Sequence, residues 1–217
     1  MKRGLFSKKL FTIILAFAVV ISSLVCVNSS NAAGNAKIKK VYKQYLKELK
    51  AEKPKKDIYM AIVNTSKEGT PVLLVTDSII NGDSKPKKES GESSHADVYN
   101  YVKGKIVYIG KISGTGSGYP IVKDGKYLVT GFHHSSDKMI VSGKKGYVEH
   151  VEGYGMGNDD GSEYDKCYKK TWELVNNKIK NEKSEKITQS ESEELDYYMA
   201  AYDSSNSDRV VTFKKFK

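Results

Sequence analysis

The sequence predicts an α+β fold in which a curved antiparallel β-meander is flanked by an N-terminal helix and a short C-terminal helix. Three observations lead to this prediction. Apolar residues recur at spacings of three and four in residues 37–53, which is typical of an amphipathic helix. Short runs rich in β-branched and aromatic residues follow. Of the 18 glycines, 13 lie between residues 104 and 161, where they would supply the turns of an antiparallel sheet.

Residues 1–33 have the order of a secretory signal peptide. A basic start precedes an uncharged run of 18 residues from Leu10 to Val27, and small residues follow it. The pattern predicts cleavage after Ala32, Ala33 or Ala36. The alternative is an uncleaved anchor, because the apolar run nearly spans a bilayer. We therefore expect a secreted, extracellular protein associated with the cell envelope, whose membrane contact is limited to this segment if it stays uncleaved.

The remaining chain, residues 37–217, is long enough for one domain. The 217-residue chain has a net charge of +10, and removing residues 1–33 leaves a net charge of +6. This modest excess, with Arg209 as the one remaining arginine, argues against nucleic-acid binding. Cys167 is then the single cysteine, so an intramolecular disulfide is impossible, and we expect a half-buried strand residue.

The first half of the domain is expected to contain a helix and two pairs of strands. The helix ends at Pro54, which cannot continue it. A strong hairpin signal follows a polar loop, since Gly104 supplies the positive φ of a two-residue turn. The predicted segments are the helix 37–53, strands 58–63 and 71–77, the loop 81–95, and the hairpin strands 97–102 and 105–109.

The second half is expected to continue the antiparallel sheet through three further hairpins. Their predicted turns are at Gly125, at Lys144-Lys145-Gly146 and at Asn176-Asn177, the last joining residues 164–175 to 178–180. Ser190 is a candidate N-cap for a short helix that runs toward Tyr202. Residues 209–216 are predicted to form a closing strand or a loose tail.

In the order of its segments and in its motifs, the chain resembles a family of exported, functionally uncharacterised proteins from Gram-positive gut-type bacteria. The resemblance spans most of residues 37–205 and rests on the hairpin 59–75, the tyrosine-rich hairpin, and Gly131 to Ser136. In that family the first hairpin carries a calcium-loop-like acidic turn. The matching oxygen positions here are Asn64, Ser66 and Glu68, but one carboxylate beside Lys67 is a poor calcium ligand set, so we expect an ordinary turn.

The run from His133 to Asp137 is the strongest candidate for chemistry. Adjacent strand residues point to opposite faces, so His133 and His134 can serve one site only if a bulge or turn intervenes. The same argument separates Glu149 from His150, and no zinc-ligand spacing is present. A small exported hydrolase using this corner is the alternative function. We expect no cofactor and no metal.

Tyrosines give the preferred functional hypothesis. Tyr99, Tyr101 and Tyr108 share one hairpin, and Tyr99 and Tyr101 should share a face. Exposed rings on a rigid sheet can stack on sugars or anchor a protein, although tyrosines also pack half-buried on sheets. We predict a non-catalytic binding module for a cell-wall glycan or an envelope protein, with Tyr99, Tyr101, Tyr108, His133 and His134 as candidate binding residues.

Overall fold

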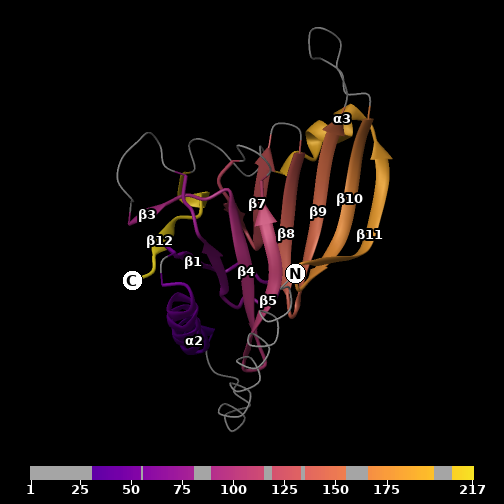
Figure 1. Ribbon diagram of the computed structural model, residues 1–217. Coiled ribbons are helices and arrows are strands. Elements are labelled where there is room, and N and C mark those ends of the chain that lie inside the picture. The colour runs from indigo at the N-terminus through magenta and orange to yellow at the C-terminus, as the bar shows by residue number, and fades with distance from the viewer. Residues whose placement is uncertain are drawn as a thin grey trace, which may run out of the picture.

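The computed structural model describes residues 31–54, 56–80, 89–114, 119–132, 135–154, 166–197 and 207–217. These residues form two six-stranded antiparallel sheets and two α-helices, so the β-rich α+β class is confirmed (Figure 1). The elements are α2 Asn31–Glu52, β1 Tyr59–Val63, β2 Val72–Thr76, β3 Ser90–Gly91, β4 His95–Val102, β5 Lys105–Ser113, β6 Val122–Asp124, β7 Tyr127–Phe132, β8 Ser135–Ser142, β9 Lys145–Tyr154, β10 Lys166–Val175, β11 Lys178–Ile187, α3 Gln189–Glu194, a 3-10 turn η1 Ser207–Arg209, and β12 Phe213–Lys215.

The strands belong to two sheets rather than to the single sheet that the sequence predicts. Sheet A has the order β3-β12-β1-β2-β4-β5, and sheet B has the order β11-β10-β9-β8-β7-β6. Neighbours in sheet B are consecutive in the chain, as hairpin turns dictate. Sheet A is completed by the last strand, β12, which pairs with β1 through Tyr59↔Lys215 and Met60↔Lys214. The predicted closing strand therefore forms, but over fewer residues.

Helix α2 covers one face of sheet A. Its buried side chains, Ile38, Tyr42 and Leu46, pack on Leu73 and Val75 of the sheet. The Tyr42 hydroxyl is buried and donates to the Pro71 carbonyl at 2.9 Å, which satisfies the polar end of an otherwise apolar contact. The helix begins at Asn31, six positions before the predicted start. Within the described residues, neither helix combines the length and the apolar character that crossing a membrane requires.

The other face of sheet A packs on sheet B around the main core. The core includes side chains from both sheets, among them Leu74, Val98, Ile109, Leu128, Met139, Val141, Leu174 and Phe213. Gly110 of β5 lies close to β10 of sheet B, because a Cβ placed there would be 2.4 Å from Leu174 Cδ2. The molecule thus has three layers, with α2 on sheet A and sheet A on part of sheet B.

Turns from one sheet also bind the other sheet. The β10–β11 turn lies on the edge of β5, where Asn177 N–H donates to the Ile109 carbonyl at 3.0 Å. Asn177 Oδ1 accepts from Lys111 N–H at 3.0 Å. The β1–β2 loop contacts the end of β8, where Lys67 N–H donates to the Val141 carbonyl at 2.7 Å. These contacts fix how the sheets meet at two separate places.

Two local predictions were wrong in position. Ser142 pairs with Lys145, so the β8–β9 turn consists of Gly143 and Lys144, and Gly146 lies inside β9. Gly143 supplies the positive φ of 52°, whereas Gly146 makes room for Met139, whose Sδ would be 2.9 Å from a Cβ there. Helix α3 is capped by Thr188 rather than by Ser190.

The cap of α3 is a complete capping box. The Thr188 hydroxyl accepts from Glu191 N–H, and the Glu191 carboxylate accepts from Thr188 N–H. The cap lies two positions earlier than predicted, although Ser190 also has a glutamate, Glu193, three positions after it. The helix ends at Glu194, and Tyr198 and Tyr202 lie outside the described residues.

Candidate functional site

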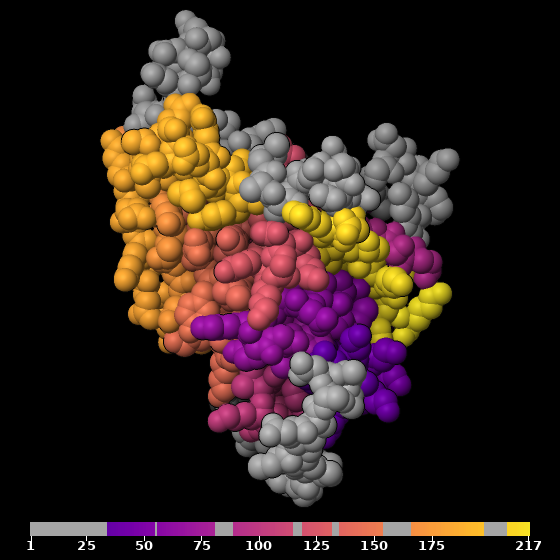
Figure 2. Space-filling model, turned by 180° about the vertical axis from the view of Figure 1, so that it is seen from behind, coloured from indigo at the N-terminus to yellow at the C-terminus, as the bar shows by residue number. Residues whose placement is uncertain are grey.

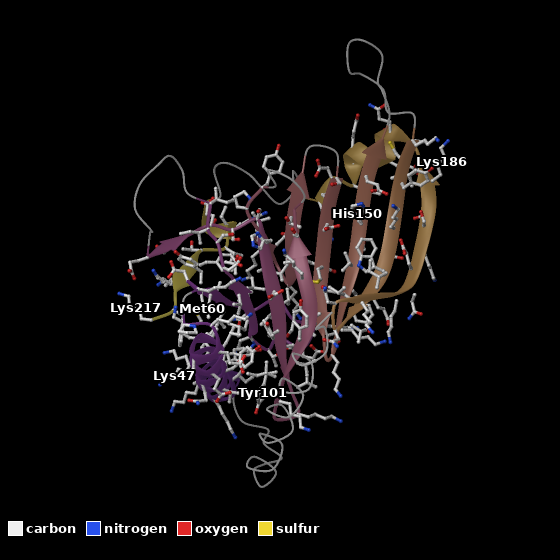
Figure 3. The ribbon with its side chains drawn as sticks, in the orientation of Figure 1. Lys47, Met60, Tyr101, His150, Lys186 and Lys217 are labelled. Atoms are coloured by element: carbon white, nitrogen blue, oxygen red, sulfur yellow. The ribbon has the colours of Figure 1, made fainter. Side chains whose placement is uncertain are left out.

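The predicted tyrosines are half-buried and do not form an exposed row of rings. Tyr99 and Tyr101 share one face, as their spacing predicts, and that face packs against α2. The Tyr99 ring lies 5.3 Å from Tyr45 of the helix and 5.2 Å from Tyr108. Burial, and then nearby ionisable groups, raise the pKa of Tyr99 and Tyr108 well above the ordinary value. In Figure 3 Tyr101 lies beside α2.

The run from His133 to Asp137 lies only partly within the described residues. His133 and His134 lie outside the described residues. Asp137 of the same corner is described, and its carboxylate binds His150 of the neighbouring strand. Ser136 is 3% exposed, and its hydroxyl accepts from Tyr197 N–H at 3.1 Å. Ser136 and Asp137 thus contact different partners on opposite faces of β8.

The loop that matched the calcium turn is held by its own hydrogen bonds. Ser66 is buried, and its hydroxyl contacts Thr70 N–H at 2.7 Å and the Thr70 carbonyl at 2.9 Å. Glu68 accepts a short hydrogen bond from the Ser142 hydroxyl of sheet B. Asn64 is exposed. Two of the three oxygen positions therefore serve contacts within the protein, and one of these contacts joins the sheets.

A network of charged side chains on sheet B is the best candidate site. His150 lies between two carboxylates, with Nδ1 2.6 Å from Asp137 Oδ1 and Nε2 3.0 Å from Glu152 Oε2. Glu152 also forms an ion pair with Lys170. The side chains are only partly accessible, with exposed fractions from 9% for Glu152 to 27% for Lys170. Three adjacent strands, β8, β9 and β10, supply the network.

Strand register places this network on the same face as the main core. Asp137, His150 and Lys170 are directly opposite one another across three strands, in the row next to Met139, Val148 and Trp172. The Trp172 ring lies 5.6 Å from the His150 ring. Tyr168 follows on the same face, 6.0 Å beneath the Lys170 ammonium. Figure 3 shows His150 on β9 in sheet B, distant from Tyr101 and α2.

Thr130 adds an unpaired hydroxyl to this row. It is directly opposite Asp137 and therefore points to the same face. Thr130 is 1% exposed, and its Oγ1 forms no hydrogen bond with any residue that the structure describes. A buried hydroxyl without a partner is unusual, because it costs about 1–3 kcal/mol. The Thr130 hydroxyl is therefore a hydrogen-bonding group next to the network that the described residues do not use.

The electrostatics of His150 favour an imidazolium ion. Burial alone would lower its pKa, but hydrogen bonds and charge from Asp137 and then Glu152 raise it above the ordinary value. Because both ring nitrogens face carboxylates, neither is available to accept a proton from a serine hydroxyl. The arrangement can hold charge and present oxygens, but it is not that of a general base and its nucleophile.

Metal chemistry receives no support from this network. Its carboxylates flank the imidazole on opposite sides instead of converging with it on one point. Across the described ranges, no group of three or more His, Cys, Asp and Glu side chains is arranged to hold a metal ion. Glu149 points to the other face, where it accepts from the Tyr197 hydroxyl at 2.9 Å. The predicted separation of Glu149 from His150 is thus confirmed.

A second histidine, His95, lines a pocket of about 170 Å³ between the end of α2 and sheet A. Its Nε2 lies 3.3 Å from Thr76 Oγ1, 3.5 Å from Ser78 Oγ and 3.5 Å from Asp77 Oδ1. A catalytic triad requires the hydroxyl and the carboxylate at different ring nitrogens. Here all three groups approach the same nitrogen, so the cluster does not have the geometry of a catalytic triad.

Part of the network could have been found in the sequence. His150 and Glu152 are two residues apart, as are Lys170 and Trp172, so each pair must share a face of its strand. What the sequence does not contain is the pairing of β8 with β9 and of β9 with β10 in the observed register. No protein family model, curated protein or solved structure matches the chain.

Proposed function

We propose that the chain is an exported, non-catalytic binding module that acts at the cell envelope, and that its ligand is a glycan. Export rests on the charge and apolar pattern of residues 1–33. The observation that carries the binding proposal is the row of charged and aromatic side chains on sheet B: Asp137, His150, Glu152, Tyr168, Lys170 and Trp172. We also propose that the chain is related to the exported Gram-positive proteins that its sequence resembles.

A glycan suits this face because sugars offer both hydroxyl groups and flat apolar patches. Carboxylates accept strong hydrogen bonds from hydroxyls, and the Lys170 ammonium donates them. Trp172 and Tyr168 offer apolar ring faces beside these groups. The mutual ion pairs of the network hold the polar groups in place, so that a ligand would meet a preorganised surface.

The proposed face favours binding over catalysis. Each ring nitrogen of His150 has a carboxylate partner, so no hydroxyl is activated in the described network. The curved meander predicted from the sequence is part of this proposal, since a concave sheet would bring side chains of neighbouring strands toward one ligand. A protein ligand is the alternative that the experiment below must separate from a glycan.

The single tryptophan gives a direct test, because Trp172 is the only such fluorophore in the chain. We expect soluble cell-wall glycan fragments to change its emission saturably. The change should be lost in Asp137→Asn and Tyr168→Ala. Tyr147→Ala is the matched control, since this tyrosine is 42% exposed and points to the opposite face of sheet B.

Three outcomes would contradict parts of the proposal. Capture of a protein but no glycan from envelope extracts would make the ligand a protein. Turnover of an ester or glycoside panel by the purified protein would make it an enzyme. Recovery of the protein only from the cytoplasmic fraction would refute export, and it would leave the fluorescence test of binding unaffected.

A further inference from the structure

A short stretch of β1 has an open edge inside sheet A. Strand β12 pairs with β1 only at Tyr59 and Met60. Before it reaches β1, the C-terminal segment contacts the other sheet, because Val210 forms an isolated antiparallel bridge with Val122 of β6. Val211 N–H also donates to the carbonyl of Ile121, the residue before β6, at 2.9 Å. Residues 210–212 therefore run beside β1 without pairing to it within the described part of the chain.

The backbone groups of Ile62 face this open edge. Ile58 accepts from Phe216 N–H at 2.8 Å, so its carbonyl points toward the β12 side. Alternate residues of a strand direct their N–H and C=O groups to the same edge, which assigns the groups of Met60 and Ile62 to that side. Met60 pairs with Lys214, whereas Ile62 has no described strand opposite. Its N–H is therefore available to a ligand.

A pocket of about 380 Å³ lies at this edge, and four cationic side chains line it. They come from elements far apart in the sequence: Lys39 of α2, Lys123 of β6, Arg209 of η1 and Lys214 of β12. In Figure 2 the C-terminal segment, in yellow, borders the pink segment that contains β6 and the violet segment of β1 and β2. The apolar side chains of Met60 and Ile62 also line the pocket.

The charge of the pocket is not balanced by its own acidic residues. Among the described residues, Asp208 is the only carboxylate in its lining, and Asp124 nearby lies 3.8 Å from Arg209. Lys39, Lys123 and Lys214 form no ion pair with any described residue. Several like charges converging on one pocket repel one another, and a bound anion would relieve this repulsion.

We propose that this pocket binds a phosphate group carried on a small organic body. A phosphate offers at least three acceptor oxygens, which suit several cations and the Ile62 N–H at once. The organic body would lie on Met60 and Ile62. The site is separate from the proposed glycan face, which lies on sheet B, so each proposal can fail without the other.

The test uses purified protein, with inorganic phosphate and glycerol 3-phosphate as probes. Titration followed by ¹⁵N amide spectra should shift the Ile62 amide. The double variant Lys39→Ala/Lys214→Ala should weaken binding at least about tenfold, because two charge-assisted contacts are lost. Lys40→Ala/Lys43→Ala removes the same charge from exposed positions of α2 outside the pocket and should bind as the unaltered protein does.

Several results would overturn this site. Equal weakening in both double variants would mean diffuse attraction to a basic surface. Binding to phosphatidylglycerol vesicles but to neither soluble probe would point to a membrane surface instead. Absence of a saturable Ile62 shift with either probe would remove the pocket from consideration. A stronger effect of glycerol 3-phosphate than of inorganic phosphate would support a contribution from the apolar side chains.

Discussion

A histidine between two carboxylates makes the stability of the protein depend on pH. His150 binds Asp137 through one nitrogen and Glu152 through the other, and its pKa is raised. An unfolded histidine titrates near its ordinary value of 6.5. Below that value the imidazolium is present in both states, and its ion pairs stabilise the folded state fully. As the pH rises through the folded pKa, the folded protein loses the proton and this stabilisation disappears.

We predict that His150→Gln removes this pH-dependent part of the free energy of unfolding. The difference between the unaltered protein and the variant should be largest below about pH 6.5 and should shrink at higher pH. Each unit by which the folded pKa is raised corresponds to about 1.4 kcal/mol. Denaturant unfolding at a series of pH values measures the difference, which should not grow toward alkaline pH.

The same interpretation can be checked directly on the imidazole ring. Asp137→Asn removes a carboxylate that raises the His150 pKa, so NMR titration of the ring should show a lower pKa than in the unaltered protein. An unchanged titration would mean that Glu152 alone holds the proton. The unaltered protein and the variant should both keep Lys170, because its positive charge next to Glu152 reduces the rise in the His150 pKa that the Glu152 carboxylate causes.

At the scale of the elements, the β10–β11 turn has two roles. Asn176 and Asn177 both have positive φ, at 50° and 59°, so they form the turn of a hairpin. Asn177 also binds β5 through its backbone N–H and through its side-chain oxygen. The turn thus joins β10 to β11 in sheet B and covers β5, the edge strand of sheet A. Fewer backbone groups of β5 are therefore left unpaired.

Because of these two roles, we expect a glycine at the second turn position to destabilise the protein rather than stabilise it. In most two-residue hairpin turns a glycine at the second position is favourable. Here Asn177→Gly should lower the free energy of unfolding by about 0.5–1.5 kcal/mol, because Lys111 N–H loses its acceptor. Asn176→Gly is the control, since the Asn176 side chain forms no hydrogen bond to the described residues, and it should be close to neutral. Denaturant unfolding of both variants distinguishes the cases, and a stabilising Asn177→Gly would show that the contact contributes nothing.

Local chemistry explains which elements could be predicted. The turns at Gly104, Gly125 and Asn176-Asn177 were confirmed because each contains residues that adopt positive φ at low cost. The turn at Gly146 was wrong because a glycine can also serve packing, and its neighbour Met139 is distant in the sequence. The Ser190 cap was wrong because Thr188 and Ser190 each have a glutamate three positions later, so the capping-box pattern does not decide between them.

At the scale of the whole molecule, the division into two sheets could not be predicted. Hairpins specify neighbours along the chain, which suffices for sheet B. Sheet A requires β12 to pass between β3 and β1, a pairing across most of the chain that no local pattern encodes. The network around His150 depends on register in the same way, since Asp137, His150 and Lys170 meet only when three strands are aligned.

The contacts between the sheets predict that both sheets unfold together. Besides the shared core, Asn100 of β4 donates from Nδ2 to the Gly143 carbonyl in the β8–β9 turn, at 2.9 Å. Asn100 is 1% exposed, so this bond is sheltered from water. Amides of Leu74 in sheet A and Val141 in sheet B should therefore exchange hydrogen with the same free energy of opening.

Asn100→Ala tests this coupling. Loss of the bond to Gly143 should lower the free energy of unfolding by about 1–3 kcal/mol, and hydrogen exchange should accelerate by the same factor at Leu74 and at Val141. Lys105→Ala, an exposed position on β5, is the control and should change neither amide. If the substitution accelerates exchange in sheet A alone, the sheets are independent folding units and the contacts between them do not couple their stability. Equal acceleration in both sheets would mean that the bond between Asn100 and Gly143 contributes to the stability of the whole molecule. The physical reason is that unfolding either sheet exposes the core that both sheets bury.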